Sequence, residues 1–176
     1  MYQARRLILT ICFIFLGACH ILFAQSFHFA LVTDTHIGGT TSLEDLERTV
    51  QDLNTMQLVD FAIFSGDITE FGSDEELKVA HGTLKKLQIP WYIIPGNHDT
   101  NWSESGGNSF LTEFGSDVFS FEHQGVVFIG TGSGPYMRMA PGQVPRENLV
   151  WLDSILLEQA DQRKPIIFIN HYPLDD

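Results

Sequence analysis

Cysteine is almost absent from this chain of 176 residues. The two that occur, Cys12 and Cys19, both lie within the first 24 residues. The rest of the chain therefore forms no disulfide and offers no thiolate to a metal. A metal site there must use oxygen and imidazole ligands, which favours Mn, Fe or Zn over a structural zinc cluster.

Basic side chains are also scarce. The sequence contains ten Lys and Arg and 22 Asp and Glu, which gives a formal net charge of -12. This balance argues against a nucleic-acid backbone as partner, because a polyanion is attracted by a basic surface. A small phosphate ester stays compatible with it, since a bound metal ion reverses the local sign of the charge.

The first 24 residues have the composition of an export signal. Arg5 and Arg6 precede an apolar run from Leu7 to Ala18, and a signal peptidase could cut before Gln25. The run is short for a membrane span. We therefore expect a cleaved signal peptide at 1–24, a domain at 25–176, no membrane span after cleavage, and a secreted protein in the periplasm or outside the cell.

A lipid anchor is the alternative to cleavage before Gln25. The segment Leu16-Gly17-Ala18-Cys19 is similar to a bacterial lipobox, in which Cys19 would be the lipidated residue. Apolar residues that continue to Phe23 make this the weaker interpretation.

Strands and helices alternate along the remainder. Apolar, β-branched and aromatic runs predict buried strands at 27–32, 61–64, 91–94 and 166–169. Ser42 with Asp45, and Ser73 with Glu76, resemble capping boxes that open the first two helices. A third helix is expected from Pro145 to about Asp161. The alternation predicts an α/β fold with a largely parallel central sheet flanked by helices.

Two shorter elements are expected between the third and the last of these strands. The segment 109–114 predicts a short helix. The apolar segments 119–121 and 126–129 flank Gln124-Gly125 and predict a β-hairpin.

Side chains suited to metal binding or proton transfer follow four of the predicted strands. They are Asp34 and His36, then Asp67, then Asn97 and His98, and finally His171. In an open α/β sheet the carboxyl ends of the strands line one crevice, so these residues should converge. A tight turn could explain Asn97 and Asp99 alone, but turn chemistry does not explain four strand ends in the same chain.

The expected ligands are carboxylates, an amide oxygen and imidazoles. A carboxylate such as Asp67 can bridge two cations. Two-metal sites clamp the attacking and leaving oxygens of a phosphoryl displacement and generate hydroxide near neutral pH.

In this order, four elements of the sequence resemble the first four motifs of the calcineurin-like metallophosphoesterases. The elements are Asp34-x-His36, Gly66-Asp67, Gly96-Asn97-His98-Asp99 and the strand-end His171. The resemblance covers nearly the whole chain after the signal and implies that family's sandwich of mixed, largely parallel sheets flanked by helices. The segment Gly66-Asp67-Ile68-Thr69-Glu70 is more similar to the branch of small-molecule and cyclic-nucleotide phosphodiesterases than to the protein phosphatases.

The resemblance implies a dinuclear metal site with two divalent or trivalent ions. Asp34 and His36 would hold the first ion, Asp67 would bridge both, and Asn97 and His171 would hold the second.

The same resemblance implies the catalytic residues. His98 would sit beside the scissile phosphate as an electrostatic partner or as proton donor to the leaving oxygen. The carboxylate of Glu70 would orient His98, and Asp99 would lie behind the metal ligands.

The resemblance also implies a fifth motif, Gly-His-x-His, which this sequence does not contain. Each ion would then be one protein ligand short. We expect a fold truncated at the C-terminus, an N-terminal piece of a longer enzyme, and weaker metal retention than in a complete site.

The sequence thus predicts a hydrolase: a metallophosphoesterase that hydrolyses phosphomonoesters or phosphodiesters through metal-bound hydroxide. The alternative is a catalytically inactive fragment that binds metal or phosphate. No nucleic-acid partner is expected.

Overall fold

A computed structural model of the chain describes residues 26–103, 105–134 and 142–173. The predicted signal at 1–24 and the candidate lipid site Cys19 lie outside this part, so both stay predictions. Within the described residues, none of the helices combines the length and the apolar character that crossing a bilayer requires.

Three parallel strands form the first sheet, in the order β1-β2-β3. They are β1 (Phe29–Val32), β2 (Phe61–Ser65) and β3 (Trp91–Ile94), connected by the helices α2 (Ser42–Thr55) and α3 (Asp74–Leu84). The predicted alternation of parallel strands and helices is confirmed in this half. Two short helices follow β3, α4 (Asn97–Thr100) and α5 (Asn108–Phe114).

The second sheet has the order β4-β5-β6 and is mixed. The strands β4 (Val118–His123) and β5 (Val126–Thr131) form the predicted hairpin, and β6 (Ile166–Ile169) joins β5 in parallel after the helix α6 (Arg146–Ala160). Gln124 and Gly125 both have positive φ, 47° and 82°, as a tight two-residue hairpin turn requires. The predicted α/β sandwich is thus confirmed, with one parallel and one mixed sheet flanked by helices.

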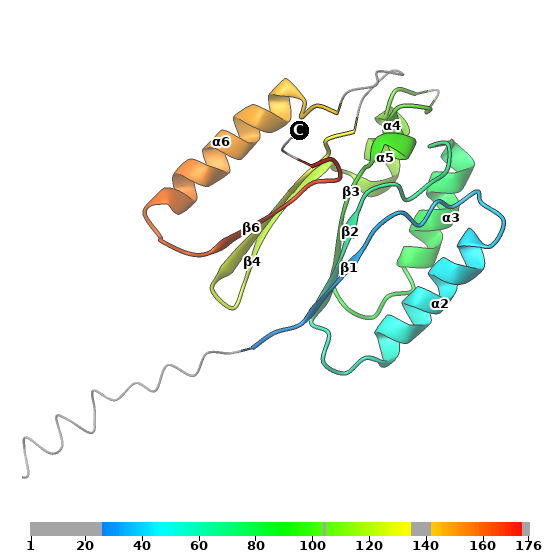
Figure 1. The fold of residues 1–176 in the computed structure, drawn as a ribbon, viewed down its shortest axis with the longest axis horizontal. Helices are drawn as coiled ribbons and strands as arrows, with labels where there is room; N and C mark the ends of the chain where they lie inside the picture. Colours follow the sequence, from blue (N-terminus) through cyan, green and yellow to red (C-terminus); the bar gives the residue numbers. More distant parts are fainter. Residues whose placement is uncertain (1–25, 104, 135–141, 174–176) are drawn as a thin grey trace, which may run out of the picture.

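The two sheets pack face to face between layers of helices. Figure 1 shows α2 and α3 on the outer side of the first sheet and α6 on the outer side of the second. Successive side chains of β2 point to opposite faces. Phe61 and Ile63 therefore enter the core between the sheets, while Ala62 and Phe64 pack in the core beneath the helices.

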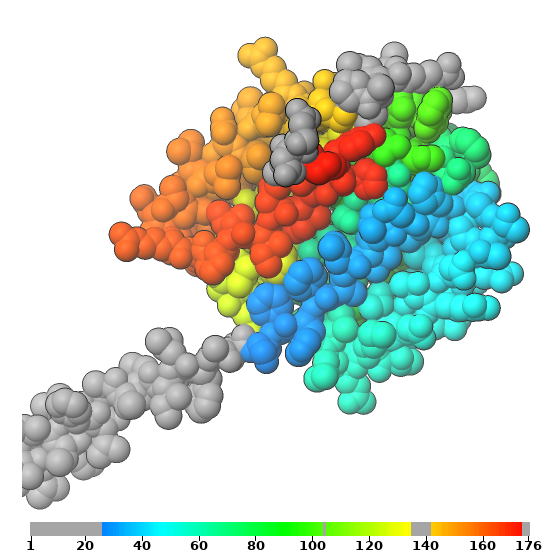
Figure 2. All heavy atoms as spheres, viewed as in Figure 1, coloured from blue at the N-terminus to red at the C-terminus, as the bar shows by residue number. Residues whose placement is uncertain are grey.

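Aromatic rings hold the sheets together. The ring of Phe61 meets the rings of Phe121 and Phe128 edge to face, at centroid distances of 5.0 and 5.1 Å. Phe128 is fully buried. Phe121 and Phe128 belong to β4 and β5, and β6 pairs with β5, so this packing also positions β6 against the first sheet. The carboxyl ends of β1, β2, β3 and β6 therefore lie at one edge. In Figure 2 the end of the described chain (red) meets the segment after β1 (blue) at that edge.

The two predicted capping boxes have different outcomes. Ser73 accepts a hydrogen bond from the Glu76 amide, and the Glu76 carboxylate accepts one from the Ser73 amide, so this box is confirmed. The box predicted for Ser42 is wrong. Helix α2 begins at Ser42 with Thr41 as N-cap, and the Ser42 hydroxyl donates to the Gly39 carbonyl instead.

This difference predicts the effect of two alanine substitutions. Ser73→Ala should lower the free energy of unfolding by about 1 kcal/mol, because an N-cap hydrogen bond is lost. Thr41→Ala is the matched control, since the Thr41 side chain caps no backbone amide of α2, and should cost clearly less. Urea unfolding of both variants measures the difference. Equal losses would contradict the assignment of the caps.

Candidate metal centre

The loops after β1 and β2 are joined by backbone hydrogen bonds. The Asp34 amide donates to the Gly66 carbonyl at 3.0 Å, and the His36 amide donates to the Asp67 carbonyl at 3.1 Å. Asp34, His36 and Asp67 all have left-handed backbone conformations, with φ of 57°, 45° and 50°. Non-glycine residues adopt this conformation at a cost of about 1 kcal/mol or more and gather at functional sites. In these conformations the side chains of Asp34, His36 and Asp67 point toward one another.

Two glycines let the strand ends approach closely enough. A Cβ on Gly96 would lie 2.2 Å from Asp67 Oδ1, and a Cβ on Gly66 would lie 2.8 Å from both the Gly96 Cα and the His171 Cγ. Any side chain at either position would push Asp67 or His171 aside. The glycines of the two motifs are therefore needed for steric reasons at this edge of the sheet.

One oxygen of Asp67 lies at the centre of the site. Asp67 Oδ2 is 3.3 Å from His171 Nε2 and 3.9 Å from His36 Nε2. The other oxygen, Oδ1, accepts a hydrogen bond of 2.8 Å from the His98 amide, which fixes the carboxylate. The residue is only 4% exposed. Asp67 Oδ2 thus lies between two histidines that follow strands of different sheets.

The surroundings of His171 fit a cation. Its Nδ1 donates to the Ser65 carbonyl at 3.0 Å, so a neutral ring has its lone pair on Nε2. That lone pair faces Asn97 Oδ1 at 3.2 Å and Asp67 Oδ2 at 3.3 Å, both of which are also acceptors. Three lone-pair atoms aimed at one another are stabilised by a metal ion among them or by a proton on His171.

The ionisation of this pair reflects the same arrangement. Burial by itself raises the pKa of Asp67, but the contacts with His171 and the His98 amide outweigh it and lower that pKa. Burial by itself lowers the pKa of His171, but its contacts with Asp67 outweigh it and raise that pKa. Without metal, the two side chains therefore favour an ion pair.

His36 presents its Nε2 to the same centre as His171 does. This Nε2 lies 3.7 Å from Asp34 Oδ1 and 3.9 Å from Asp67 Oδ2, and the buried Nδ1 lies 2.9 Å from Glu70 Oε2. The Glu70 oxygen is close to Nδ1 without forming an aligned hydrogen bond with it. A carboxylate at this nitrogen would orient the ring of a histidine that binds a metal through Nε2.

His98 takes its orientation from a backbone group. Its Nδ1 lies 2.6 Å from the carbonyl oxygen of Glu70 and donates to it, so Nε2 is the nitrogen that can contact a bound ligand. The rings of His98 and His36 meet edge to face with centroids 4.7 Å apart. The contact expected between the Glu70 carboxylate and His98 is thus made by the Glu70 backbone, while the carboxylate lies against His36.

The buried carboxylate of Asp99 connects two segments of the site through hydrogen bonds. Asp99 is fully buried, and its carboxylate accepts hydrogen bonds from the amides of Ile68, Thr69 and Gly96 and from the Thr69 hydroxyl. Burial raises the pKa of Asp99, although the four donors act in the opposite direction. This side chain joins the loop after β2 to the start of α4, as its predicted place behind the ligands required.

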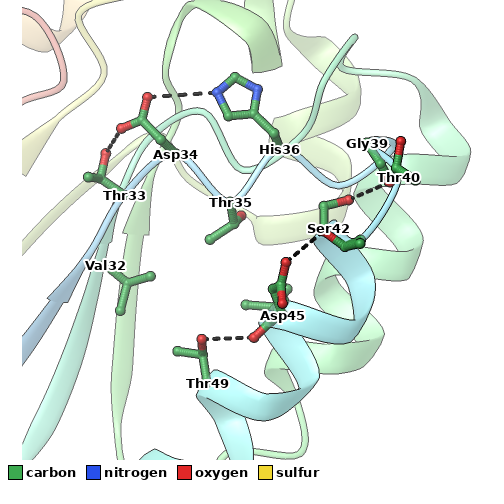
Figure 3. A pocket seen from close by; sticks show the side chains of 12 residues that line it. Val32, Thr33, Asp34, Thr35, His36, Gly39, Thr40, Ser42, Asp45 and Thr49 are labelled. Atoms are coloured by element: carbon green, nitrogen blue, oxygen red, sulfur yellow. Dashed lines mark hydrogen bonds and ion pairs between the residues drawn. The ribbon is translucent and has the colours of Figure 1, made fainter.

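A cavity of about 390 Å³ adjoins Asp34 and His36. Figure 3 shows these two side chains pointing toward one another, with Thr35 between them in sequence and with Ser42, Asp45 and Thr49 on α2. Thr33 Oγ1 donates to Asp34 Oδ2 at 2.5 Å. Asp34 is half exposed, so solvent reaches this side of the site.

Every residue predicted for the site therefore contacts another member of it. Among the described residues, two groups have ligand atoms close enough to share an ion. They are Asp34 with Asp67 and His171, and His36 with Glu70 and His98. Sequence reasoning missed the Ser65 carbonyl that orients His171 and the contact between Glu70 and His36. A backbone carbonyl has no signature in the sequence, and spacing does not fix the direction of a side chain.

The sequence is similar to those of known proteins. The family model for calcineurin-like phosphoesterases matches residues 27–176. A probable glycerophosphodiester phosphodiesterase, GpdQ, from Arcobacter nitrofigilis is 30% identical in an alignment 163 residues long, which covers 81% of this chain and 56% of that protein. A probable cyclic nucleotide phosphodiesterase from Fibrobacter succinogenes is 26% identical in an alignment 158 residues long, which covers 81% of this chain and 55% of that protein.

The chain spans about half the length of these curated relatives. Among solved structures, a purple acid phosphatase from yellow lupin seeds superposes with a TM-score of 0.57 at 15% identity, over 82% of this chain and 30% of that one. That likeness concerns the fold alone. With the family model matched over nearly all of the described residues, the chain belongs to the calcineurin-like phosphoesterase family.

Proposed function

We propose that this chain carries the catalytic site of a metal-dependent phosphoesterase that hydrolyses phosphodiesters of small alcohols, and phosphomonoesters less well. The observation that carries the proposal is the single oxygen, Asp67 Oδ2, that both His36 and His171 face. The names of the two curated relatives support phosphodiesters as the preferred substrates.

Two ions, of Mn, Fe or Zn, would be held by the converging side chains. Asp34 and His36 would hold the first, Asn97 and His171 the second, and Asp67 both. When bound, the ions would neutralise the charge of the phosphate and activate the attacking water. The donor set of oxygens and imidazoles, free of sulfur, suits these metals.

His98 would serve the leaving group. The Glu70 carbonyl fixes its Nδ1 as a donor, so Nε2 is the nitrogen that can hold a proton toward the leaving alcohol. His98 belongs to α4, and its half-buried ring lies beside the ring of His36.

Loss of this imidazole should separate turnover from metal binding. We expect His98→Ala to lower kcat about 100-fold or more, the usual contribution of a positioned acid. Manganese content should stay that of the parent chain, because the ligands themselves are untouched. Loss of manganese from His98→Ala would instead make His98 a ligand.

The carboxylate of Glu70 is proposed to orient His36, whereas His98 contacts the backbone carbonyl of Glu70. Glu70→Gln should weaken manganese binding at the first ion about tenfold, as removal of an orienting carboxylate does. Glu44→Gln, an exposed change on α2, is the control and should leave binding unchanged. Unchanged manganese affinity together with a lower kcat would restore Glu70 to the role of orienting His98.

The direct test is hydrolysis of bis(4-nitrophenyl) phosphate and of 4-nitrophenyl phosphate by the purified chain loaded with manganese. We expect faster hydrolysis of the diester, loss of activity with EDTA and recovery with manganese. A manganese-loaded chain without activity on either ester would leave the alternative, an inactive fragment that binds metal. Export through the segment 1–24 remains a separate part of the proposal.

A further inference from the structure

Ser133 is a buried polar residue that the proposed chemistry does not use. It lies two residues beyond the end of β5, between Gly132 and Gly134, and is only 3% exposed. A buried hydroxyl is costly for folding unless it forms a hydrogen bond, so its partner indicates what the residue does.

The Ser133 hydroxyl holds the backbone next to His171. Ser133 Oγ accepts a hydrogen bond of 3.0 Å from the amide of Tyr172, which directly follows His171. This bond connects the end of β5 with the loop after β6 and restrains the peptide between His171 and Tyr172. The ring of His171 is held separately, through the bond from its Nδ1 to the Ser65 carbonyl. Backbone and ring of His171 thus each have an anchor of their own.

The residue after Ser133 contacts the segment of the other candidate ligand. A Cβ on Gly134 would lie 2.7 Å from the carbonyl carbon and oxygen of Gly96 and 2.9 Å from the amide nitrogen of Asn97. Gly134 therefore packs directly on the peptide that leads into Asn97. The Ser133 carbonyl also accepts a hydrogen bond of 3.0 Å from the Gln143 amide, which fixes Ser133 itself.

We propose that Ser133 is a positioning residue for the ion that Asn97 and His171 would hold. The inference rests on the proposed function for the presence of that ion. His171 Nε2 lies 3.2 Å from Asn97 Oδ1, and a shift of the His171 backbone would change this distance directly. Asp34 and His36 follow β1 in the other sheet, so the first ion should not depend on Ser133.

Ser133→Ala removes the hydrogen-bond acceptor and adds no bulk. Titration calorimetry with manganese should show one binding step weakened about tenfold, the usual effect of losing a group that orients a metal ligand, and the other step unchanged. The weakened step should be the one that Asn97→Ala also weakens. Ser116→Ala is the matched control, because Ser116 Oγ likewise accepts from a backbone amide, that of Val118, and should leave both steps unchanged.

Rescue by threonine tests the hydrogen bond itself. Ser133→Thr keeps the hydroxyl and should bind manganese as the parent chain does. Unchanged manganese binding by Ser133→Ala, or equal weakening of both steps, would overturn the inference. A Ser133→Thr variant as weak as Ser133→Ala would overturn it as well.

One measurement needs no substitution. In the ¹⁵N-labelled parent chain with EDTA, the Tyr172 amide should exchange its hydrogen slowly, because it is bonded to Ser133 Oγ. Exchange as fast as that of an unprotected amide would overturn the inference, even if Ser133→Ala did not fold.

The assay of the two nitrophenyl esters separates this inference from the proposed function. Selective weakening of one manganese step in a chain that hydrolyses neither ester would reject the phosphoesterase function and leave the role of Ser133 standing. Ester hydrolysis by the parent chain, together with parent-like manganese binding by Ser133→Ala, would reject the role of Ser133 alone.

Discussion

Replacement of Asp67 by asparagine is expected to abolish binding of both metal ions and with it all phosphoesterase activity. The substitution removes the negative charge and places either an N–H₂ group or a single amide oxygen where Oδ2 now faces His36 and His171. We expect manganese affinity to fall by more than about a hundredfold at both positions, beyond the loss that an outer residue would cause. Isothermal titration with manganese measures it.

Asn97→Ala tests whether Asp67 is truly shared. Among the described residues, Asn97 Oδ1 has its side-chain contact with His171, so loss of this oxygen should weaken one ion and spare the other. If Asp67→Asn also removed a single ion, the carboxylate would belong to one metal and the bridging assignment would be wrong.

Asp99→Asn is expected to give the largest loss of stability in the site. Both carboxylate oxygens accept from two donors each, Oδ1 from Thr69 and Oδ2 from the amides of Ile68 and Gly96. An asparagine amide must place its N–H₂ against one of these donor pairs, whichever way it is turned. Buried donors left without an acceptor predict a loss of about 3 kcal/mol in the free energy of unfolding.

Guanidinium unfolding in the presence of EDTA measures this loss apart from any effect of metal. Asp153→Asn, on the exposed face of α6, is the control and should stay within about 0.5 kcal/mol of the parent chain. An Asp99→Asn variant as stable as this control would contradict the bracing role of Asp99.

The fold could be predicted to the extent that it follows from local pattern. Apolar runs that end in Pro, Gly or polar residues located the strands. The capping box at Ser73 was identified because its two partners, Ser73 and Glu76, are three residues apart. The start of α2 was placed wrongly because Ser42 already lies within the helix, where its hydroxyl donates to the Gly39 carbonyl.

The site could be predicted as a set but not as a geometry. Four strand ends carry the ligands, and the strand-end rule places them at one edge. Three of the candidate ligands, Asp34, His36 and Asp67, are in left-handed conformations, which Asp and His adopt more often than most residues but which their type does not dictate. Glu70 was placed correctly beside the site, yet its carboxylate lies against His36 while its carbonyl holds His98, and only the three-dimensional path of the loop decides between them.

Anomalous diffraction from a crystal of the manganese-loaded chain tests whether Asp67 bridges two ions. We expect two manganese peaks, one on each side of the Asp67 carboxylate, the first contacted by Asp34 and His36 and the second by Asn97 and His171. A single peak held by His36, Glu70 and His98, the other group of close ligand atoms, would contradict this expectation.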